Sequence, residues 1–216
     1  MDTWVMIEQL FFGMLVSIQI FVATLLFSMP LGFVIYFGRV STNKYIQTLT
    51  KLYISLMRGT PLVLQLLVVY FGPYYLFGIK ISPSYKMIAV IIGFSLNYAA
   101  YFAEIYRGGI LSIDKGQYEA AMALGYNKAQ TFIIIILPQV FKVILPSITN
   151  EVITLIKDTT LAFVLAVAEI FTIAKQIASA QTTMLPFVIA GIFYFCFNFI
   201  VQFAMESLEK KLSYYD

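Results

Sequence analysis

Long apolar runs separated by short polar segments dominate the order of residues in this chain. Tyr and Cys aside, no ionisable side chain lies between Glu8 and Arg39, between Arg58 and Lys80, or between Lys175 and Glu206. A shorter gap runs from Lys86 to Glu104. About 20 apolar residues, at a rise of about 1.5 Å each, cross the hydrocarbon core of a bilayer. The pattern therefore predicts three membrane-spanning helices and a fourth of nearly sufficient length.

In all, about five transmembrane helices are expected, over residues 8–37, 44–70, 84–106, 131–156 and 184–204. Pro61 should interrupt the second helix, because proline lacks an amide N–H and disfavours helix in the preceding residue. An outer loop is expected over residues 72–83, and Gly108-Gly109 should end the third helix. Because the fourth contains Pro138 and Pro146, it is expected to consist of broken helical pieces inside the bundle. The amphipathic segment 159–180 is expected to lie partly outside the membrane.

The composition supports the same fold class. Hydrophobic residues make up 61% of the chain and charged residues 12%, against about 45–50% and about 25% in soluble domains. We predict a single all-α integral membrane domain over residues 1–216, surrounded by lipid. The chain has no His, and its one cysteine, Cys196, lies in an aromatic run that favours a packing role. No catalytic or metal-binding residues are therefore predicted, and a net charge of +3 gives no reason to expect a nucleic-acid partner.

Basic residues indicate the orientation of the chain in the membrane. One set of helix ends carries Arg39, Lys44, Lys51, Arg107, Lys115, Lys128, Lys210 and Lys211, and the other carries Lys80, Lys86 and Lys175. Loops rich in Lys and Arg usually stay in the cytoplasm. We therefore expect the N-terminus outside the cell, with the C-terminus and the loop 112–128 in the cytoplasm.

Within this loop, the residues from Gln117 to Leu124 favour a helix of about two turns, between Gly116 and Gly125. Its alanines allow close backbone approach, and Met122 suits a surface that must repack. A short helix of this kind could insert into the groove of a partner protein or rest on lipid headgroups. The physical properties of the residues leave both interpretations open.

A resemblance to a known family decides between them. Seven residues match the spacing of the EAA loop in permease subunits of bacterial ATP-binding-cassette (ABC) importers: Glu119, Ala120, Ala121, Gly125, Ile135, Leu137 and Pro138. Flanking runs resemble the polar amino-acid uptake branch, which includes histidine-, glutamine- and arginine-type permeases. These runs begin at Arg58, Ala103, Lys115 and Lys157. The resemblance covers most of the chain, from about Leu52 to Glu206.

The resemblance implies a type I importer transmembrane domain in the bacterial cytoplasmic membrane, carrying an amino-acid substrate. It implies three kinds of partner: ABC ATPase subunits, a second permease subunit that is identical or related, and an external solute-binding protein. The chain has no glycine-rich phosphate loop ending in Lys-Ser or Lys-Thr. We therefore expect no enzyme activity and no cofactor in this chain, with ATP and Mg bound by the partner ATPase. A coupling helix over about residues 117–125 would contact that ATPase through Gln117, Glu119, Ala120, Ala121, Leu124 and Gly125.

Polar residues within the apolar segments indicate where a substrate could pass, because such residues are costly in a membrane and usually functional. By depth, Arg58, Asn97 and Glu151 fall near the middle of their helices. The candidate pathway residues are Arg58, Thr60, Gln65, Asn97, Tyr101, Glu151 and Asp158. Glu151 and Asp158, seven residues apart, share a helix face and could favour cationic amino acids. Each has a structural alternative: Arg58 could simply pair with a carboxylate, and Glu104 with Arg107 could be a structural or gating pair. Glu169 and Lys175 are expected to be surface charges.

Other functions are compatible with parts of the pattern. An ion-coupled secondary carrier would also place acidic residues in its spans, but it would need a longer chain with repeats. An intramembrane enzyme would need a nucleophile and a base at depth. A scaffold without transport activity would have no use for the coupling helix.

Overall fold

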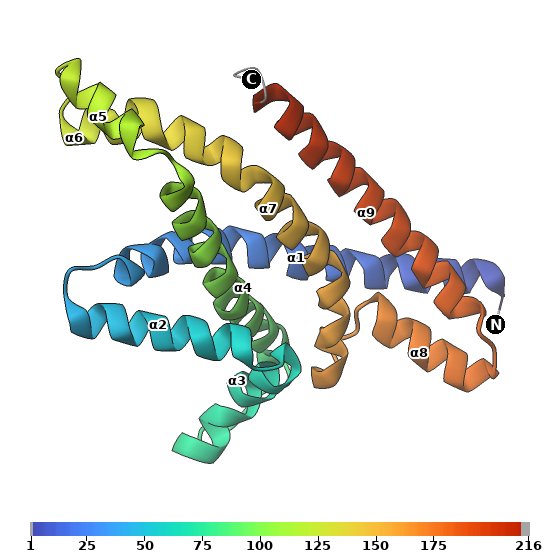
Figure 1. Cartoon of the computed structure of the whole chain (residues 1–216). Helices are drawn as coiled ribbons and strands as arrows, with labels where there is room; N and C mark the ends of the chain where they lie inside the picture. The colour runs from blue at the N-terminus through green and yellow to red at the C-terminus, as the bar shows by residue number, and fades with distance from the viewer. Residues whose placement is uncertain (1, 213–216) are drawn as a thin grey trace.

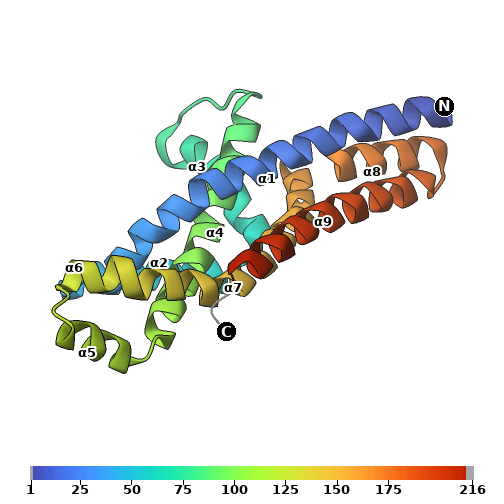
Figure 2. The same ribbon diagram turned by 90° about the horizontal axis from the view of Figure 1, so that it is seen from above.

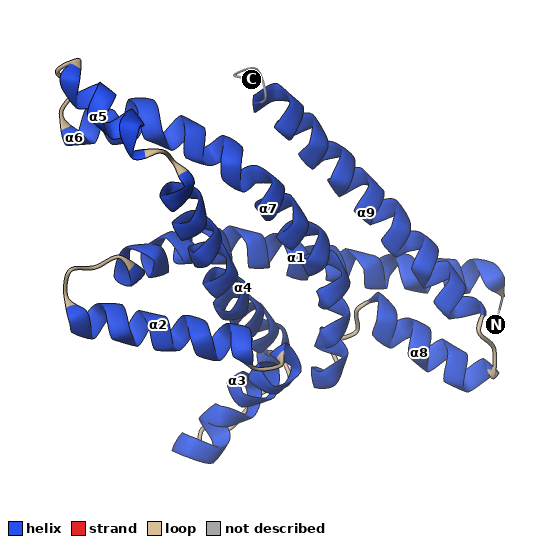
Figure 3. Cartoon of the chain, viewed as in Figure 1, coloured by secondary structure: helices blue, strands red, loops and turns tan. Residues whose placement is uncertain are grey.

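The computed structural model describes residues 2–212, and helices joined by short connections make up this part of the chain (Figures 1 and 3). The α-helices are α1 (Thr3–Arg39), α2 (Lys44–Gly59), α3 (Leu62–Phe77), α4 (Tyr85–Ser112), α5 (Lys115–Ala123), α6 (Lys128–Gln130), α7 (Leu137–Asp158), α8 (Ile170–Gln181) and α9 (Leu185–Leu212). A π-helix, η1 (Thr131–Ile136), leads into α7, and a 3-10 helix, η2 (Thr159–Leu165), follows it. The all-α fold class is therefore confirmed.

Four of the helical segments in the described part of the chain are long and apolar enough to cross a membrane: Thr3–Arg39, Tyr85–Ser112, Lys128–Leu165 and Leu185–Leu212. A fifth span results if α2 and α3, which meet at an angle of 112°, are counted as one broken helix. The break follows from Pro61, since Thr60 before it adopts an extended conformation with φ −121° and ψ 148°. The prediction of about five spans, with the second one interrupted, agrees with the structure.

The main core forms where α1 crosses α4 (Figure 1). A Cβ atom on Gly32 of α1 would lie 2.9 Å from the Cβ of Phe102 in α4, so the two backbones approach closely at this glycine. The rings of Phe33 and Tyr106 stack with centroids 4.0 Å apart. The hydroxyl of Tyr106 donates a hydrogen bond of 3.3 Å to the carbonyl of Met29. These contacts fix α4 against the middle of α1 and so position the residues that α4 carries.

A second, smaller core lies between the N-terminal half of α1, α8 and α9, which run beside one another in Figure 2. Met6, Leu10 and Met14 are buried here against Ile170 and Ala174 of α8. By contrast, most of α9 is exposed, including Phe195, Phe199 and Phe203 at every fourth position. Exposed apolar surface of this extent suits contact with lipid or with another subunit.

The fourth expected helix is continuous rather than broken. Residues 128–165 form one helical span, in which η1 passes directly into α7. Pro138 lies in the first turn of α7, directly after η1, where the wider π-helical turn accommodates a residue without an N–H. Pro146 lies inside α7 without ending it.

Two other expected helix ends are also wrong. α4 continues through Gly108-Gly109 to Ser112. The glycine at 109 is explained by packing instead, because a Cβ there would overlap the side chain of Ile144 in α7. α3 continues through Pro73 into the expected outer loop and ends at Phe77, where Gly78 adopts a left-handed conformation with φ +66°.

Glu169 is not a surface charge, because its exposed fraction is 0%. Its carboxylate caps the N-terminus of α8, accepting hydrogen bonds from the backbone N–H of Phe171 at 2.8 Å and of Thr172 at 2.7 Å. The hydroxyls of Thr172 and Tyr194 also donate to it, at 2.8 and 3.3 Å. Burial raises the pKa of this carboxyl, and these hydrogen bonds to the charged form partly oppose the rise. The cap explains how a carboxyl group is tolerated in the interior.

Candidate substrate pathway and coupling helix

The break between α2 and α3 is closed by two buried amides. Ending α2 at Gly59 leaves backbone carbonyls without their helical partners. The side chain of Gln65 donates to the carbonyls of Met57 at 3.0 Å and Thr60 at 3.1 Å, and to the Thr60 hydroxyl at 2.8 Å. Asn97 of α4 donates to the Met57 carbonyl and to the Gln65 side-chain oxygen, each at 2.9 Å. Three of the candidate pathway residues therefore hold the broken helix in place.

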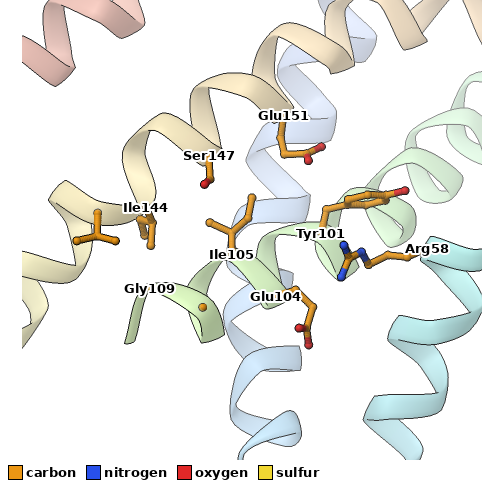
Figure 4. Close-up of a pocket in the computed structure, with 10 residues that line it drawn as sticks. Arg58, Tyr101, Glu104, Ile105, Gly109, Ile144, Ser147 and Glu151 are labelled. Atoms are coloured by element: carbon orange, nitrogen blue, oxygen red, sulfur yellow. The ribbon is translucent and has the colours of Figure 1, made fainter. Parts of the chain in front are cut away.

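Next to this break lies a cavity of about 390 Å³, formed between α2, α4 and α7 (Figure 4). Its lining comprises Arg58, Tyr101, Glu104, Ile105, Gly108, Gly109, Val143, Ile144, Ser147 and Glu151. The volume lies within the range of small-molecule sites, about 300–1,000 Å³. In Figure 4, Arg58 extends from α2 towards Tyr101, and Glu151 approaches from α7 on the other side of the ring.

The charges in the cavity have different surroundings. The Arg58 guanidinium lies over the Tyr101 ring, 5.2 Å from its centroid, in a cation–π contact. Glu104 is held by Arg107, with N–O distances of 2.9 and 2.7 Å, and by Arg39 of α1 at 3.5 Å. Glu151 makes no hydrogen bond or close ion pair from its side chain to any of residues 2–212. Arg58 and Glu151 are thus the charges of opposite sign that remain available to a ligand.

The candidate pathway residues are therefore divided among three places. Arg58, Tyr101 and Glu151 line the cavity, whereas Thr60, Gln65 and Asn97 form the network at the helix break. Asp158, at the end of α7, accepts a hydrogen bond of 2.7 Å from the buried Tyr98 hydroxyl and is not part of the cavity lining.

Sequence reasoning did not identify Ser147 or Ile105 as part of this site. Ser147 lies one turn before Glu151, so helical spacing could have indicated it. Ile105 carries no polar signal, and its place in the lining follows only from how α4 packs. Glu104 and Arg107 form the pair expected from their spacing, and Arg39 of α1 joins them.

The helix of the long loop, α5, begins at Lys115, two residues before the expected start, and ends at Ala123. Asp114 caps it by accepting a hydrogen bond of 2.6 Å from the Gly116 amide. α5 packs on η1, and Ala121 is 1% exposed whereas Leu124 is 76% exposed. Of the six candidate coupling residues, only Ala121 is buried, and the Gln117 side chain accepts a hydrogen bond of 3.4 Å from Gln139 of α7.

The position of α5 also suits contact with a partner. It projects from one end of the molecule in both Figure 1 and Figure 2. Gly125, just after it, has φ +84°, a conformation that favours glycine. Glu119, Met122 and Leu124 are exposed. The helix is therefore anchored on one side and free on the other.

Comparisons with known proteins identify the family and the fold. Residues 28–214 match the family model described as "Binding-protein-dependent transport system inner membrane component". The arginine transport system permease protein ArtQ of Bacillus subtilis (strain 168) is 39% identical over 201 residues, covering 93% of this chain and 90% of that protein. The L-cystine transport system permease protein TcyB of the same organism is 32% identical, covering 98% and 92%.

Solved structures show the same fold. A crystal structure of an amino acid ABC transporter with histidines has a TM-score of 0.86 and 29% identity, covering 98% of this chain and 99% of that one. An inward-facing structure of the MetNI methionine ABC transporter, at 16% identity, has a TM-score of 0.74. The fold is therefore that of a type I ABC importer transmembrane domain, and the comparisons favour the importer over the ion-coupled carrier. This chain belongs to the family of inner membrane components of binding-protein-dependent transport systems.

Proposed function

We propose that this chain is the transmembrane subunit of an ATP-driven importer of polar amino acids. The similarity to ABC permeases for arginine, glutamine and cystine supports an amino acid as the substrate. The cavity next to the broken helix is the proposed passage, since it lies between the three elements that carry polar residues at depth. The observation that carries the proposal is the pair of opposite charges, Arg58 and Glu151, which line this cavity on either side of the Tyr101 ring.

A free amino acid carries a carboxylate and an ammonium group, so a site for it needs both signs of charge. Arg58 supplies hydrogen-bond donors for the carboxylate, and Glu151 supplies acceptors for the ammonium group or for a cationic side chain. Asp158 lies seven residues beyond Glu151 on the same face of α7, outside the cavity lining, and provides a second carboxyl further along the proposed pathway. These groups support a preference for basic amino acids, in agreement with the arginine permease among the relatives.

Energy would enter through α5. In the proposal, the exposed residues Glu119, Met122 and Leu124 insert into an ABC ATPase subunit, which binds ATP and Mg. A second permease subunit completes the pathway, and an external solute-binding protein delivers the amino acid. The distribution of basic residues at the helix ends supports a cytoplasmic position for α5 and the C-terminus and an outer position for the N-terminus.

The experiment is uptake by the purified complex in proteoliposomes, with the binding protein outside and ATP inside. We expect uptake of radiolabelled arginine that needs ATP and does not respond to an imposed proton or sodium gradient. Uptake that follows the ion gradient without ATP would support the carrier instead. No uptake of any amino acid with ATP and binding protein present would contradict the proposal.

A further inference from the structure

The helix α2 has three different faces, although only Ile54 is fully buried. Ile54, Tyr53 and Met57 pack against the main core. A second face is apolar and exposed and consists of Tyr45, Leu49, Leu52 and Leu56. A third is polar and exposed and consists of Lys44, Gln47, Thr48, Lys51, Ser55 and Arg58. We call this third set the polar face of α2.

The polar face is continuous along the whole helix. Lys44, Lys51 and Arg58 are seven residues apart, and an α-helix drifts by only about 20° per seven residues, so the three side chains leave α2 on nearly the same side. They follow one another at intervals of about 10 Å along the axis. Ser55 and Thr48 lie between them on the same side.

One end of the polar face is part of the cavity. Arg58 lines the cavity and lies over Tyr101 (Figure 4). From there the face leads back along α2 to Lys44, next to the short connection that follows α1. The last residue of α1, Arg39, is bound to Glu104 in the cavity wall. The polar face therefore joins the cavity to the end of α1.

The apolar and polar faces of α2 require different surroundings. The face with Leu49 and Leu52 is suited to lipid, whereas a face with three cations is costly in hydrocarbon unless it faces water or protein. Both faces are exposed in this chain, and the polar one is continuous with a cavity that holds polar groups. Both faces have suitable surroundings if lipid borders the apolar face and a water-filled space borders the polar face.

On the basis of the proposed function, we infer that the polar face of α2 lines the route by which the amino acid leaves the cavity towards the cytoplasm. Its cations guide the α-carboxylate, the group that all amino acids share. Lys51 lies on this route midway between the cavity residue Arg58 and the exit at Lys44. Uptake of basic and neutral amino acids depends equally on the charge at this position.

Cysteine substitution tests the inference. Cys196→Ser removes the exposed native thiol, and Lys51→Cys is compared with Leu52→Cys on the apolar face. Water-soluble methanethiosulfonates of opposite charge, one with a trimethylammonium and one with a sulfonate group, are applied to the complex in proteoliposomes from the side that carries the ATPase. We expect rapid labelling at position 51 and little at position 52. We expect the sulfonate at 51 to lower uptake about fivefold relative to the trimethylammonium group, because only the latter restores the charge.

The outcomes separate the two levels of the proposal. Equal uptake with both reagents at position 51 would contradict the exit route, as would equal labelling at positions 51 and 52. Rapid labelling at 51 that affects no transport is the pattern expected of a helix lying flat on the membrane surface, with its apolar face in lipid and its polar face in water. If the Cys196→Ser parent shows no ATP-driven uptake while the wild type does, Lys51→Cys and Leu52→Cys are made with Cys196 retained, and labelling at each position is read by mass spectrometry. If neither transports, the proposed function fails and the inference fails with it.

Discussion

The side chain of Asn97 donates a hydrogen bond of 2.9 Å to the side-chain oxygen of Gln65, and this contact joins α4 to α3 across the break in the second span. Both amides are buried, and both also bond to the Met57 carbonyl at the end of α2. A backbone carbonyl without a partner is costly in a bilayer, so these two side chains make the broken helix possible. The position of Arg58, one residue after Met57, depends on them.

Loss of this contact should therefore destabilise the protein. Asn97→Ala removes both hydrogen bonds that Asn97 donates, and we expect a loss of about 1–3 kcal/mol from the free energy of unfolding. Thermal unfolding in detergent measures the effect. Asn150→Ala is the matched control, because Asn150 is exposed on α7. Equal stability of both variants would show that the amide network is not needed.

The neutral variant Glu151→Gln tests the role of this residue in the pathway. We expect about tenfold lower uptake of a basic amino acid, equivalent to about 1.4 kcal/mol, because the amide no longer attracts a cation. Uptake of a neutral amino acid should fall less. Competition uptake in proteoliposomes gives both values from one preparation. Glu8→Gln, which removes a charge at an exposed position in α1, should leave the ratio unchanged, and an unchanged ratio in Glu151→Gln would remove this residue from the site.

The backbone at Gly125 should matter for coupling. With φ +84°, a side chain there is strained by about 1–2 kcal/mol, enough to change an equilibrium about 5–30-fold. Gly125→Ala and Gly125→Asp should lower uptake while ATP hydrolysis continues, and Glu119→Lys should do the same through its charge. The ratio of amino acid transported to ATP hydrolysed is the measurement. Gly72→Ala is the control, because a Cβ there meets nothing within 4 Å and the backbone is helical. Unchanged ratios in all three coupling variants would contradict the role given to α5.

Substitution by alanine should have different effects on stability at two neighbouring glycines of α4. A Cβ at Gly109 would overlap Ile144 of α7, so Gly109→Ala should cost about 1–3 kcal/mol of stability. A Cβ at Gly108 meets nothing within 4 Å, so Gly108→Ala should be neutral or stabilise the helix by up to about 1 kcal/mol. The free energy of unfolding in detergent is measured for both variants. In the double variant Gly109→Ala/Ile144→Ala, the smaller side chain at 144 should restore part of the stability that Gly109→Ala loses. Similar behaviour of the two single variants would show that α4 and α7 are not closely packed here.

The sequence by itself determined the membrane class, the number of spans, the break at Pro61 and the short helix around Glu119. Each of these depends on local properties: the length of an apolar run, the missing N–H of proline, and residue spacing within one segment. The family followed from the same short-range pattern, because the spacing from Glu119 to Pro138 belongs to one loop and its flanks.

Only the tertiary structure decided which polar residues meet. Asn97, Tyr101 and Glu104 share one face of α4, yet Asn97 bonds to the helix break while the other two line the cavity. Glu169 seemed an isolated charge along the chain and is a buried helix cap. Gly109 does not end α4. Its missing side chain leaves space for Ile144, 35 positions later in the sequence. Such roles depend on contacts between distant helices, and those contacts are set by how side-chain volumes fit together, which no single segment contains.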